Sequence, residues 1–319
     1  VNRGGCFYGQ PPSYFDPYNN PNSQHESLRN GLHGLPGRKA GEYLTRREAD
    51  EAEALIREWH AKEQSFFLQV SHYAVHTPIQ AIEEVAAKYE REGKNATNAK
   101  YAAMVESVDD STRQILATLK ELDIDENTIV IFTSDNGGLD GNGRPTENAP
   151  LRSGKGFPYE GGVRVPFIVR WPGVIPAGKV SKTPVCSIDI FPTIMEATGS
   201  PLPSERVIDG ISLLPHMKSG GSASLDRDEL LWHFPHYRYG SPPYSIIRQG
   251  EWKLIKFWEG SYELFNLATD LGEEKNLAQD MPEKVKELDA LLLKRLRADQ
   301  AKLPRKNPDY VPKESTDTP

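Results

Sequence analysis

The sequence has few cysteines, no long apolar run and no excess of basic residues. Cys6 and Cys186 are its only cysteines, too few for a disulfide scaffold, and their spacing matches no zinc knuckle. No apolar run approaches the roughly 18 residues that a bilayer-spanning helix needs. A net charge of −7 gives no basic surface for a polyanion. We therefore expect no membrane span in this chain and no nucleic-acid partner.

The composition is otherwise that of a globular protein. The 319 residues are 37% hydrophobic and 26% charged, which is enough for one large domain and a smaller one. The sequence begins at Val1 with neither an initiator methionine nor a signal peptide. We expect the chain to begin in mid-domain.

The stretch from Thr128 to Pro166 carries the most informative pattern. Five β-prone residues, Ile129–Thr133, stop at Ser134–Gly138, as a buried strand does where it meets a loop at the carboxyl edge of a sheet. Asp135 and Asn136 offer one charged and one neutral oxygen, and the two glycines after them allow a tight turn. Such oxygens suit calcium or magnesium. The alternative is an ordinary turn, since Asp, Asn and Gly are common turn formers.

A lysine lies further along the same stretch. Lys155 stands between Gly154 and Gly156, so the neighbouring backbone can approach a ligand closely. A flexible surface loop can have the same composition, but together with a cation site the lysine indicates an anionic substrate. Downstream, Glu160 and Arg164 could be ligands, although we favour a buried ion pair that supports the lysine loop.

The joint pattern resembles a known family. TSDNGG followed by LRSGKGFPYEGGVRVPFIVRWPG is similar to the type I sulfatases of the alkaline phosphatase superfamily, and the likeness extends from GQPPSYFDPY to the final helix. The resemblance implies that Asp135 and Asn136 ligate calcium, with magnesium the less favoured metal. It also implies that Lys155 binds the sulfate group.

Two histidines follow another predicted strand, Phe66–Val70. His76 precedes Thr77-Pro78, and in the sulfatase pattern the histidine before x-Pro contacts the sulfate and the oxygen of the leaving alcohol. An imidazole suits that place, because an alkoxide leaves poorly until it is protonated or hydrogen-bonded. We predict a catalytic role for His76 and a structural or supporting role for His72.

The segment Trp232–Arg238 combines aromatic rings, two imidazoles and a guanidinium. Such groups stack on sugar rings and hold anionic groups, and many carbohydrate sulfatases carry a similar stretch. Aromatic packing between subdomains is the alternative. We predict that His233, His236 and Arg152 bind substrate.

One part of the sulfatase pattern has no counterpart here. The family's nucleophile is a formylglycine made from the Cys or Ser of a C/S-x-P-x-R motif, and neither Cys6 in GGCFYG nor Cys186 in PVCSIDI has the required Pro and Arg. The family's two N-terminal aspartate ligands and its Lys-x-His site are also unmatched. We expect this chain to be the C-terminal part of a sulfatase whose formylglycine lies outside it.

The predicted fold is α/β, with a mixed sheet flanked by helices and a smaller C-terminal α+β subdomain. We assign residues 1–218 to the catalytic domain, 225–303 to the antiparallel sheet plus helix, and 304–319 to a loose tail. A long ordered loop is expected at 9–41. Apolar periodicity predicts a helix capped by Thr45, helices at 100–122, 188–199 and 282–302, and strands at 66–70, 129–133, 167–169, 229–232, 244–248, 252–257 and 262–266.

The resemblance implies that the complete enzyme hydrolyses a sulfate ester by attack of hydrated formylglycine on sulfur. Calcium and Lys155 would offset charge on the sulfuryl oxygens, and His76 would assist the leaving alcohol. The substrate is expected to be a sulfated small molecule or glycan, with carbohydrate or polysaccharide sulfates favoured. A phosphate or phosphonate ester hydrolase of the same superfamily and a non-catalytic sulfated-glycan binding protein are the alternatives. Family habit implies a periplasmic or secreted enzyme, and the sequence leaves its oligomeric state unknown.

The chain by itself is expected to show no sulfatase activity and to be poorly stable. Without an N-terminal part its strands would lack neighbours, leaving unpaired edges and an incomplete core. An assay with 4-nitrophenyl sulfate, together with a thermal melt, measures both properties. A soluble monomer that turns over this ester at enzyme-like rates would contradict the prediction.

Overall fold

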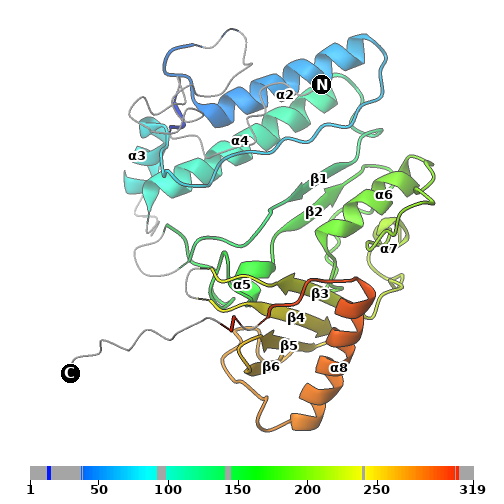
Figure 1. Ribbon diagram of the computed structural model, residues 1–319. Coiled ribbons are helices and arrows are strands. Elements are labelled where there is room, and N and C mark those ends of the chain that lie inside the picture. The colour runs from blue at the N-terminus through cyan, green and yellow to red at the C-terminus, as the bar shows by residue number, and fades with distance from the viewer. Residues whose placement is uncertain are drawn as a thin grey trace. The chain divides into compact units, whose positions relative to one another are not determined.

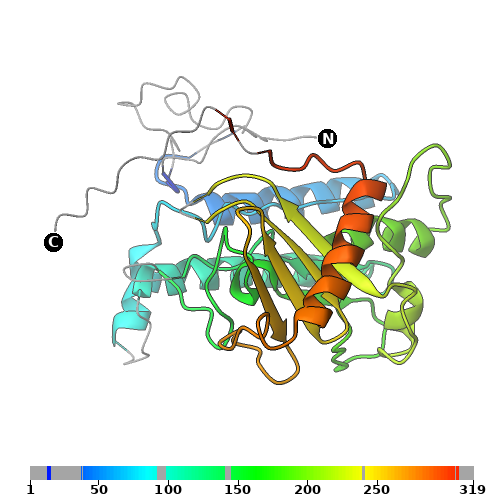
Figure 2. The same cartoon turned by 60° about the horizontal axis from the view of Figure 1, so that its bottom comes forward.

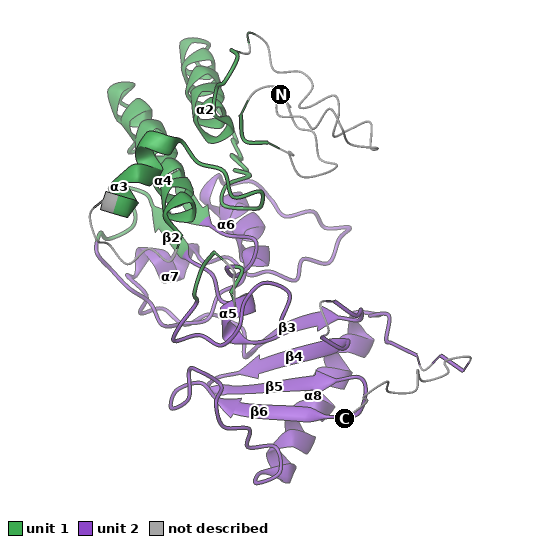
Figure 3. Cartoon of the chain, turned by 90° about the vertical axis from the view of Figure 1, so that its left-hand side faces the viewer, with its two compact units in different colours: residues 1–132, 139–147, 167–177 green, residues 133–138, 148–166, 178–319 purple. Residues whose placement is uncertain are grey.

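The structure is a computed structural model (Figure 1). It describes residues 13–15, 37, 39–91, 98–140, 145–238, 241–305 and 307–308. The chain forms two compact units (Figure 3). Unit 1 comprises residues 1–132, 139–147 and 167–177, and unit 2 comprises 133–138, 148–166 and 178–319.

This division differs from the boundary at 218–225 that we predicted. The C-terminal sheet shares its unit with residues 178–218 and with two short segments, 133–138 and 148–166. They are the segments that carry the Asp135 and Lys155 motifs. Composition indicates where the chain is flexible. It does not show which distant segments contact one another and form one unit.

Unit 1 is built on three helices, α2 (Leu44–Ala61), α3 (Glu83–Arg91) and α4 (Ala99–Glu121). Both α2 and α3 pack against α4. The apolar face of α2 is buried, as the sequence periodicity predicts, through Leu44, Ala49, Ala52, Leu55 and Ile56. The side chain of Asn98 caps α4 by accepting from the backbone N–H of Tyr101 at 2.9 Å. The predicted helix over 100–122 is confirmed.

A two-stranded sheet pairs β1 (Val130–Thr133) with β2 (Phe167–Arg170). Both strands agree with the predicted ones at 129–133 and 167–169. Arg170, at the end of β2, donates to Asp125 at 2.8 Å, just before β1. The Asp135 motif therefore begins directly where a paired strand ends.

The C-terminal part of unit 2 is an antiparallel sheet in the order β3-β4-β5-β6. Its strands, as predicted, are β3 (Glu229–Phe234), β4 (Tyr244–Gln249), β5 (Trp252–Phe257) and β6 (Tyr262–Asn266). Helix α8 (Pro282–Ala298) lies across the sheet (Figure 2). It confirms the final helix predicted at 282–302, although α8 ends earlier, at Ala298.

The two faces of this sheet pack against different partners, because neighbouring residues of a strand point to opposite sides. One face, formed by Ile247, Leu254 and Leu264, packs on Leu288, Leu292 and Leu296 of α8. The other face includes Ile246, Ile255 and Phe265, and it packs on Tyr159 and Val163. These last two residues lie in and beside helix α5 (Glu160–Val163), just after Lys155. The sheet therefore supports the lysine segment directly.

A buried aspartate organises the connection between the site segments and the sheet. This region contains η1 (Ser187–Asp189), α6 (Ile190–Ala197) and α7 (Leu214–Lys218), which includes the predicted helix near 188–199. Asp189 is fully buried. It accepts from the backbone of Cys186 at 2.8 Å and of Ile211 at 3.0 Å, and Arg227 donates to both of its oxygens. Such charge-assisted bonds offset the cost of burying the carboxylate.

Two expectations about local structure are wrong. Helix α2 begins at Leu44, with Tyr43 at the N-cap position, so Thr45 lies inside the first turn and does not cap the helix. Residues 66–70 are not a strand. A strand needs a hydrogen-bonding neighbour, and no described segment pairs with these residues.

Other sequence expectations fall outside the described residues. These are Cys6, most of the loop at 9–41, and residues 309–319 of the tail. No helix within the described ranges is long and apolar enough to cross a membrane.

Replacing Leu254 with alanine should strongly destabilise unit 2. Leu254 is fully buried between the sheet and α8, and a Leu→Ala change at such a site costs about 2–5 kcal/mol. Val207→Ala is the control, because Val207 is 90% exposed and surface changes usually stay within about 0.5 kcal/mol. Urea unfolding of the full-length protein measures both, and equal midpoints for the two variants would contradict the packing described.

Candidate functional site

The Asp135 loop (Ser134–Gly138) follows β1 immediately. The hydroxyl of Ser134 donates to the backbone oxygen of Asn136 at 2.9 Å, which closes a tight turn. Asp135 is exposed and Asn136 is half-buried. The turn thus presents a carboxylate at the surface, next to an amide whose nitrogen donates to the oxygen of Gly137 at 3.3 Å.

The Lys155 loop (Asn148–Gly162) is hydrogen-bonded to the Asp135 loop in both directions. The backbone N–H of Lys155 donates to the oxygen of Gly138 at 3.0 Å, and the N–H of Gly137 donates to the oxygen of Gly162 at 3.0 Å. Both loops belong to unit 2. The predicted metal-binding and sulfate-binding segments therefore share one backbone framework.

Close approach of backbone segments, between the two loops and within the Lys155 loop, explains three of their glycines. A Cβ on Gly137 would lie 1.7 Å from the backbone oxygen of Gly161, and one on Gly161 would lie 2.0 Å from the oxygen of Ser153. A Cβ on Gly162 would lie 2.3 Å from the oxygen of Phe157. No side chain fits at those distances, so these glycines are required by space and not by conformation.

Asn148 is a residue of the site that the sequence did not reveal. Its side-chain amide donates to the backbone oxygens of Gly138 at 3.0 Å and Ser153 at 2.9 Å. One amide group thereby joins the Asp135 loop to the middle of the Lys155 loop. Asparagine is common in loops for local reasons, so nothing in the pattern distinguished this one.

Arg152, predicted to bind substrate, has structural contacts within unit 2. It donates to the backbone oxygen of Glu273 at 2.9 Å, and its guanidinium lies 3.7 Å from the centre of the Tyr159 ring. It is also 3.7 Å from the carboxylate of Glu263. These contacts hold the guanidinium against other residues of unit 2. Its substrate-binding role stays a prediction.

The favoured ion pair at Glu160 is present, with a different partner. The carboxylate of Glu160 is 3% exposed, and the ammonium of Lys253 on β5 donates to it at 2.9 Å. Arg164, the partner suggested by the sequence, lies 3.9 Å away and is half exposed. Lys253 was not foreseen, because a lysine in a strand is usually solvent-exposed.

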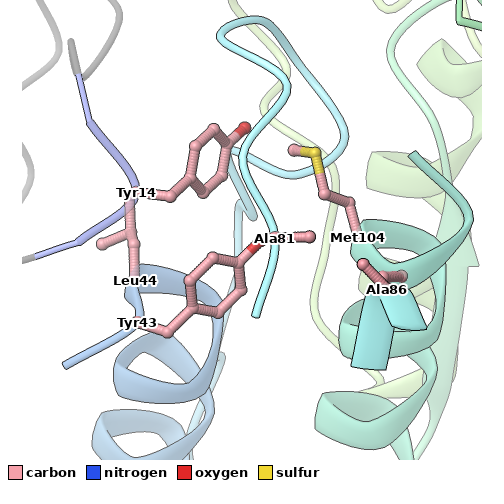
Figure 4. Packing of buried hydrophobic residues seen from close by; sticks show 7 residues of the cluster. Tyr14, Tyr43, Leu44, Ala81, Ala86 and Met104 are labelled. Carbon is pink, nitrogen blue, oxygen red and sulfur yellow. The ribbon is translucent and has the colours of Figure 1, made fainter. Parts of the chain in front are cut away.

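His76 lies in unit 1, in a turn supported by a buried tyrosine. Tyr14 is fully buried, which raises the pKa of its phenol, and its hydroxyl lies 2.8 Å from the backbone oxygens of both Tyr73 and His76. Figure 4 shows Tyr14 beside Tyr43 in the surrounding core. The phenol therefore fixes the backbone of the turn that carries the imidazole.

The hydrogen bonding of His76 favours one tautomer. Its Nδ1 lies 2.9 Å from the backbone oxygen of Thr77. A carbonyl oxygen only accepts, so Nδ1 carries the proton in this contact. In this tautomer Nε2 is the ring nitrogen that can accept a hydrogen bond.

His72 has the structural role that we predicted. Its Nδ1 lies 2.7 Å from a carboxylate oxygen of Glu48 in α2, and its Nε2 lies 2.9 Å from the hydroxyl of Ser111 in α4. The ring therefore joins two helices of unit 1. Both nitrogens are occupied by these contacts.

His233 is held inside the C-terminal subdomain. Its Nε2 donates to the backbone oxygen of Lys302 at 3.0 Å, and its Nδ1 lies 2.7 Å from the hydroxyl of Ser245. That hydroxyl oxygen accepts from the indole of Trp258 at 2.9 Å. These contacts within the C-terminal subdomain engage both ring nitrogens of His233, and its substrate role remains a prediction.

His236 lies at the exposed end of the same segment. Its ring meets Phe234 edge-on, with centroids 5.6 Å apart. Tyr237 beside it is 72% exposed and donates to Glu259 at 2.7 Å. Of the two predicted histidines here, His236 is exposed, whereas His233 is half-buried.

The residues suited to a metal form only part of a coordination sphere. Calcium takes about 6–8 oxygen ligands, whereas Asp135 and Asn136 supply two side chains. No group of three or more His, Cys, Asp or Glu residues in the described ranges could hold a metal. The donor types fit a hard cation, provided that further ligands come from outside the described residues.

Comparison with family models gives two matches. Residues 5–200 match the Sulfatase family, and residues 153–302 match the C-terminal region of N-sulphoglucosamine sulphohydrolase. The first match covers more than half of the chain. The second includes Lys155 and the C-terminal sheet.

Curated relatives are similar over most of this chain. A sulfatase from Formosa agariphila is 37% identical over 283 residues, covering 81% of this chain and 50% of that protein. N-acetylgalactosamine-6-sulfatase from Mus musculus is 33% identical over 284 residues, covering 85% and 52%. Steryl-sulfatase from Mus musculus is 38% identical over 197 residues, covering 60% and 30%. The chain thus spans about half the length, or less, of these relatives.

A solved structure agrees with the sequence relatives. Ps i-CgsB in complex with k-i-k-neocarrahexaose superposes with a TM-score of 0.68 at 30% identity, covering 83% of this chain and 56% of that one. This similarity confirms the predicted α/β sulfatase fold. With the Sulfatase family matched over residues 5–200, the chain belongs to the sulfatase family.

Proposed function

We propose that the complete protein hydrolyses sulfate esters, with sulfated carbohydrates as its substrates. The observation that carries the proposal is the pair of reciprocal backbone hydrogen bonds between the Asp135 and Lys155 loops. These bonds hold together the Asp135 loop, whose side-chain oxygens could ligate a metal, and the loop that carries Lys155. A cation and a lysine side by side suit the hydrolysis of an ester that carries negative charge, such as a sulfate ester.

The names of the relatives support the carbohydrate class. N-acetylgalactosamine-6-sulfatase is named for a sugar sulfate and is similar over 85% of this chain, and Ps i-CgsB was crystallised with neocarrahexaose. Steryl-sulfatase, which is named for a steryl substrate and not for a sugar, is similar over 60% of this chain. The broader similarity therefore lies with the carbohydrate group.

Each residue would have one task in the proposed reaction. Lys155 would bind the sulfate oxygens as a cation, and His76 would hydrogen-bond the oxygen of the leaving alcohol. Asp135 and Asn136 would hold calcium together with further ligands. Calcium would offset charge on the sulfuryl oxygens, and formylglycine would supply the nucleophile.

Asp135→Ala should weaken calcium binding and abolish turnover of the full-length protein. Indirect changes at metal sites already cost about 10–100-fold, so loss of a direct ligand should cost more. Isothermal titration with calcium and an assay with 4-nitrophenyl sulfate measure the two effects. Asp280→Ala, at an exposed position, is the control. Undiminished turnover after chelation, or unchanged calcium affinity in Asp135→Ala, would contradict the metal role.

His76→Ala and Lys155→Ala should respond differently to the leaving group. A group that assists departure contributes about 100- to 10,000-fold, and this loss should be largest for sugar or alkyl sulfates, whose alcohols have a high pKa. Loss of Lys155 should reduce kcat/KM similarly for all esters, because sulfate is common to them. Measuring kcat/KM over sulfate esters of graded alcohol pKa tests both roles, and an equal loss across the series for His76→Ala would exclude assistance of departure.

The same assay separates the alternatives. Preference for a phosphate or phosphonate monoester over the matching sulfate would favour the superfamily's other hydrolases. Binding of a sulfated glycan without turnover would favour a binding protein. Sulfate release from a sulfated oligosaccharide is the result that we expect.

A further inference from the structure

The C-terminal sheet holds a buried ammonium that contacts two carboxylates. Lys253 of β5 is 1% exposed, and its Nζ lies 2.9 Å from Glu160 and 2.8 Å from Glu273. The carboxylates of Glu160 and Glu273 are 3% and 0% exposed. A charge buried this deeply is costly unless it is paired and hydrogen-bonded, so the three groups depend on one another.

This triad joins the Lys155 loop to the sheet at two points. At one point, Glu273 accepts from the backbone N–H of Glu160 at 2.6 Å through its carboxylate. At the other, its backbone oxygen accepts from Arg152 at 2.9 Å. Lys155 lies between residues 152 and 160, so both flanks of its loop are attached to the turn after β6.

Other charged groups face the triad more weakly. Arg248 and Arg164 lie 3.7 Å and 3.9 Å from the outer oxygen of Glu160. Burial raises the pKa of Glu273, and the ammonium of Lys253 opposes that rise. Among these contacts, Lys253 alone pairs with both carboxylates.

Stability alone does not explain a buried ion triad. Well-packed apolar side chains of similar volume often stabilise a core as well or better, and the same sheet face carries buried apolar residues such as Ile246, Ile255 and Phe265. What the triad adds is direction, because ion pairs with hydrogen bonds fix an angle as well as a distance. Direction matters most where a loop must hold a ligand-binding side chain.

We propose that Lys253 is a positioning residue for sulfate binding, which through Glu160 and Glu273 fixes the loop that carries Lys155. The inference rests on the proposed function, since it takes Lys155 as the sulfate ligand. It makes the C-terminal sheet part of the binding site's support. Lys253 itself touches no substrate.

The test measures inorganic sulfate as a competitive inhibitor of the full-length enzyme, with 4-nitrophenyl sulfate as substrate. Lys253→Met keeps the volume and removes the charge. We expect its inhibition constant for sulfate to rise about tenfold or more, and kcat/KM to fall by about 100-fold, as small misplacements can cause. Hydrogen exchange should speed up at the backbone N–H groups of residues 155–162.

Two further variants separate positioning from folding. Lys253→Met with Glu273→Gln removes one of the two carboxylates that lose their ammonium partner, so it should regain part of the lost thermal stability while the sulfate constant stays raised. Glu160→Gln weakens the same pair from the loop side without a change of volume, and it should raise the sulfate constant even if both Lys253 variants fail to fold.

Lys256→Met is the matched control. Lys256 lies on the same strand and pairs with Asp289 of α8 at 2.9 Å, on the face away from the Lys155 loop. We expect this variant to lose thermal stability with no change in sulfate affinity.

The outcomes distinguish this inference from the proposed function. If wild type is inhibited by sulfate and Lys155→Ala is not, but the folded Lys253 and Glu160 variants keep the wild-type constant, the positioning role is wrong. An equal effect of Lys256→Met would also overturn it. If wild type neither binds sulfate nor hydrolyses sulfate esters, the proposed function fails first.

Discussion

The candidate site depends on a contact between two backbones. Gly137 and Gly161 approach so closely that no Cβ fits between them, and the hydrogen bonds on either side of this contact run from one loop to the other. Side chains that bind an anion or a cation must stand at fixed separations, and backbone contact sets these more rigidly than side-chain packing does. The glycines therefore contribute to the site although they carry no reactive group.

The same principle applies to His76 within unit 1, by different means. There a buried phenol, that of Tyr14, contacts the carbonyl groups on both sides of the turn. In unit 2 the supports are an amide at Asn148 and an ammonium at Lys253. Tyr14 and Lys253 are buried and Asn148 is half-buried, whereas Asp135, the predicted metal ligand, is exposed.

Sequence reasoning found the elements and the exposed chemistry better than the supports. Periodicity predicted α4, α8 and all four strands of the C-terminal sheet, because one face of each is apolar over several turns or residues. It failed at residues 66–70, where a β-prone run has no described neighbour to pair with, since pairing is not a local property. Asn148 and Lys253 were missed because their residue types are ordinary in loops and on strand surfaces, and only the tertiary fold buries them. A buried ion pair at Glu160 was predicted, but its partner, Lys253, lies far along the chain and was not.

That sequence distance has a consequence for biosynthesis. Glu160 and Lys253 are 93 residues apart, and Arg152 and Glu273 are 121 apart. A chain that emerges from the ribosome N-terminus first can make the local turns of the Lys155 loop early. It cannot complete the loop's attachments until β5 and the turn after β6 have been synthesised. Translation that stops between Gly162 and Glu273 would therefore release a protein whose Lys155 loop has formed its turns but lacks its attachments to Glu273.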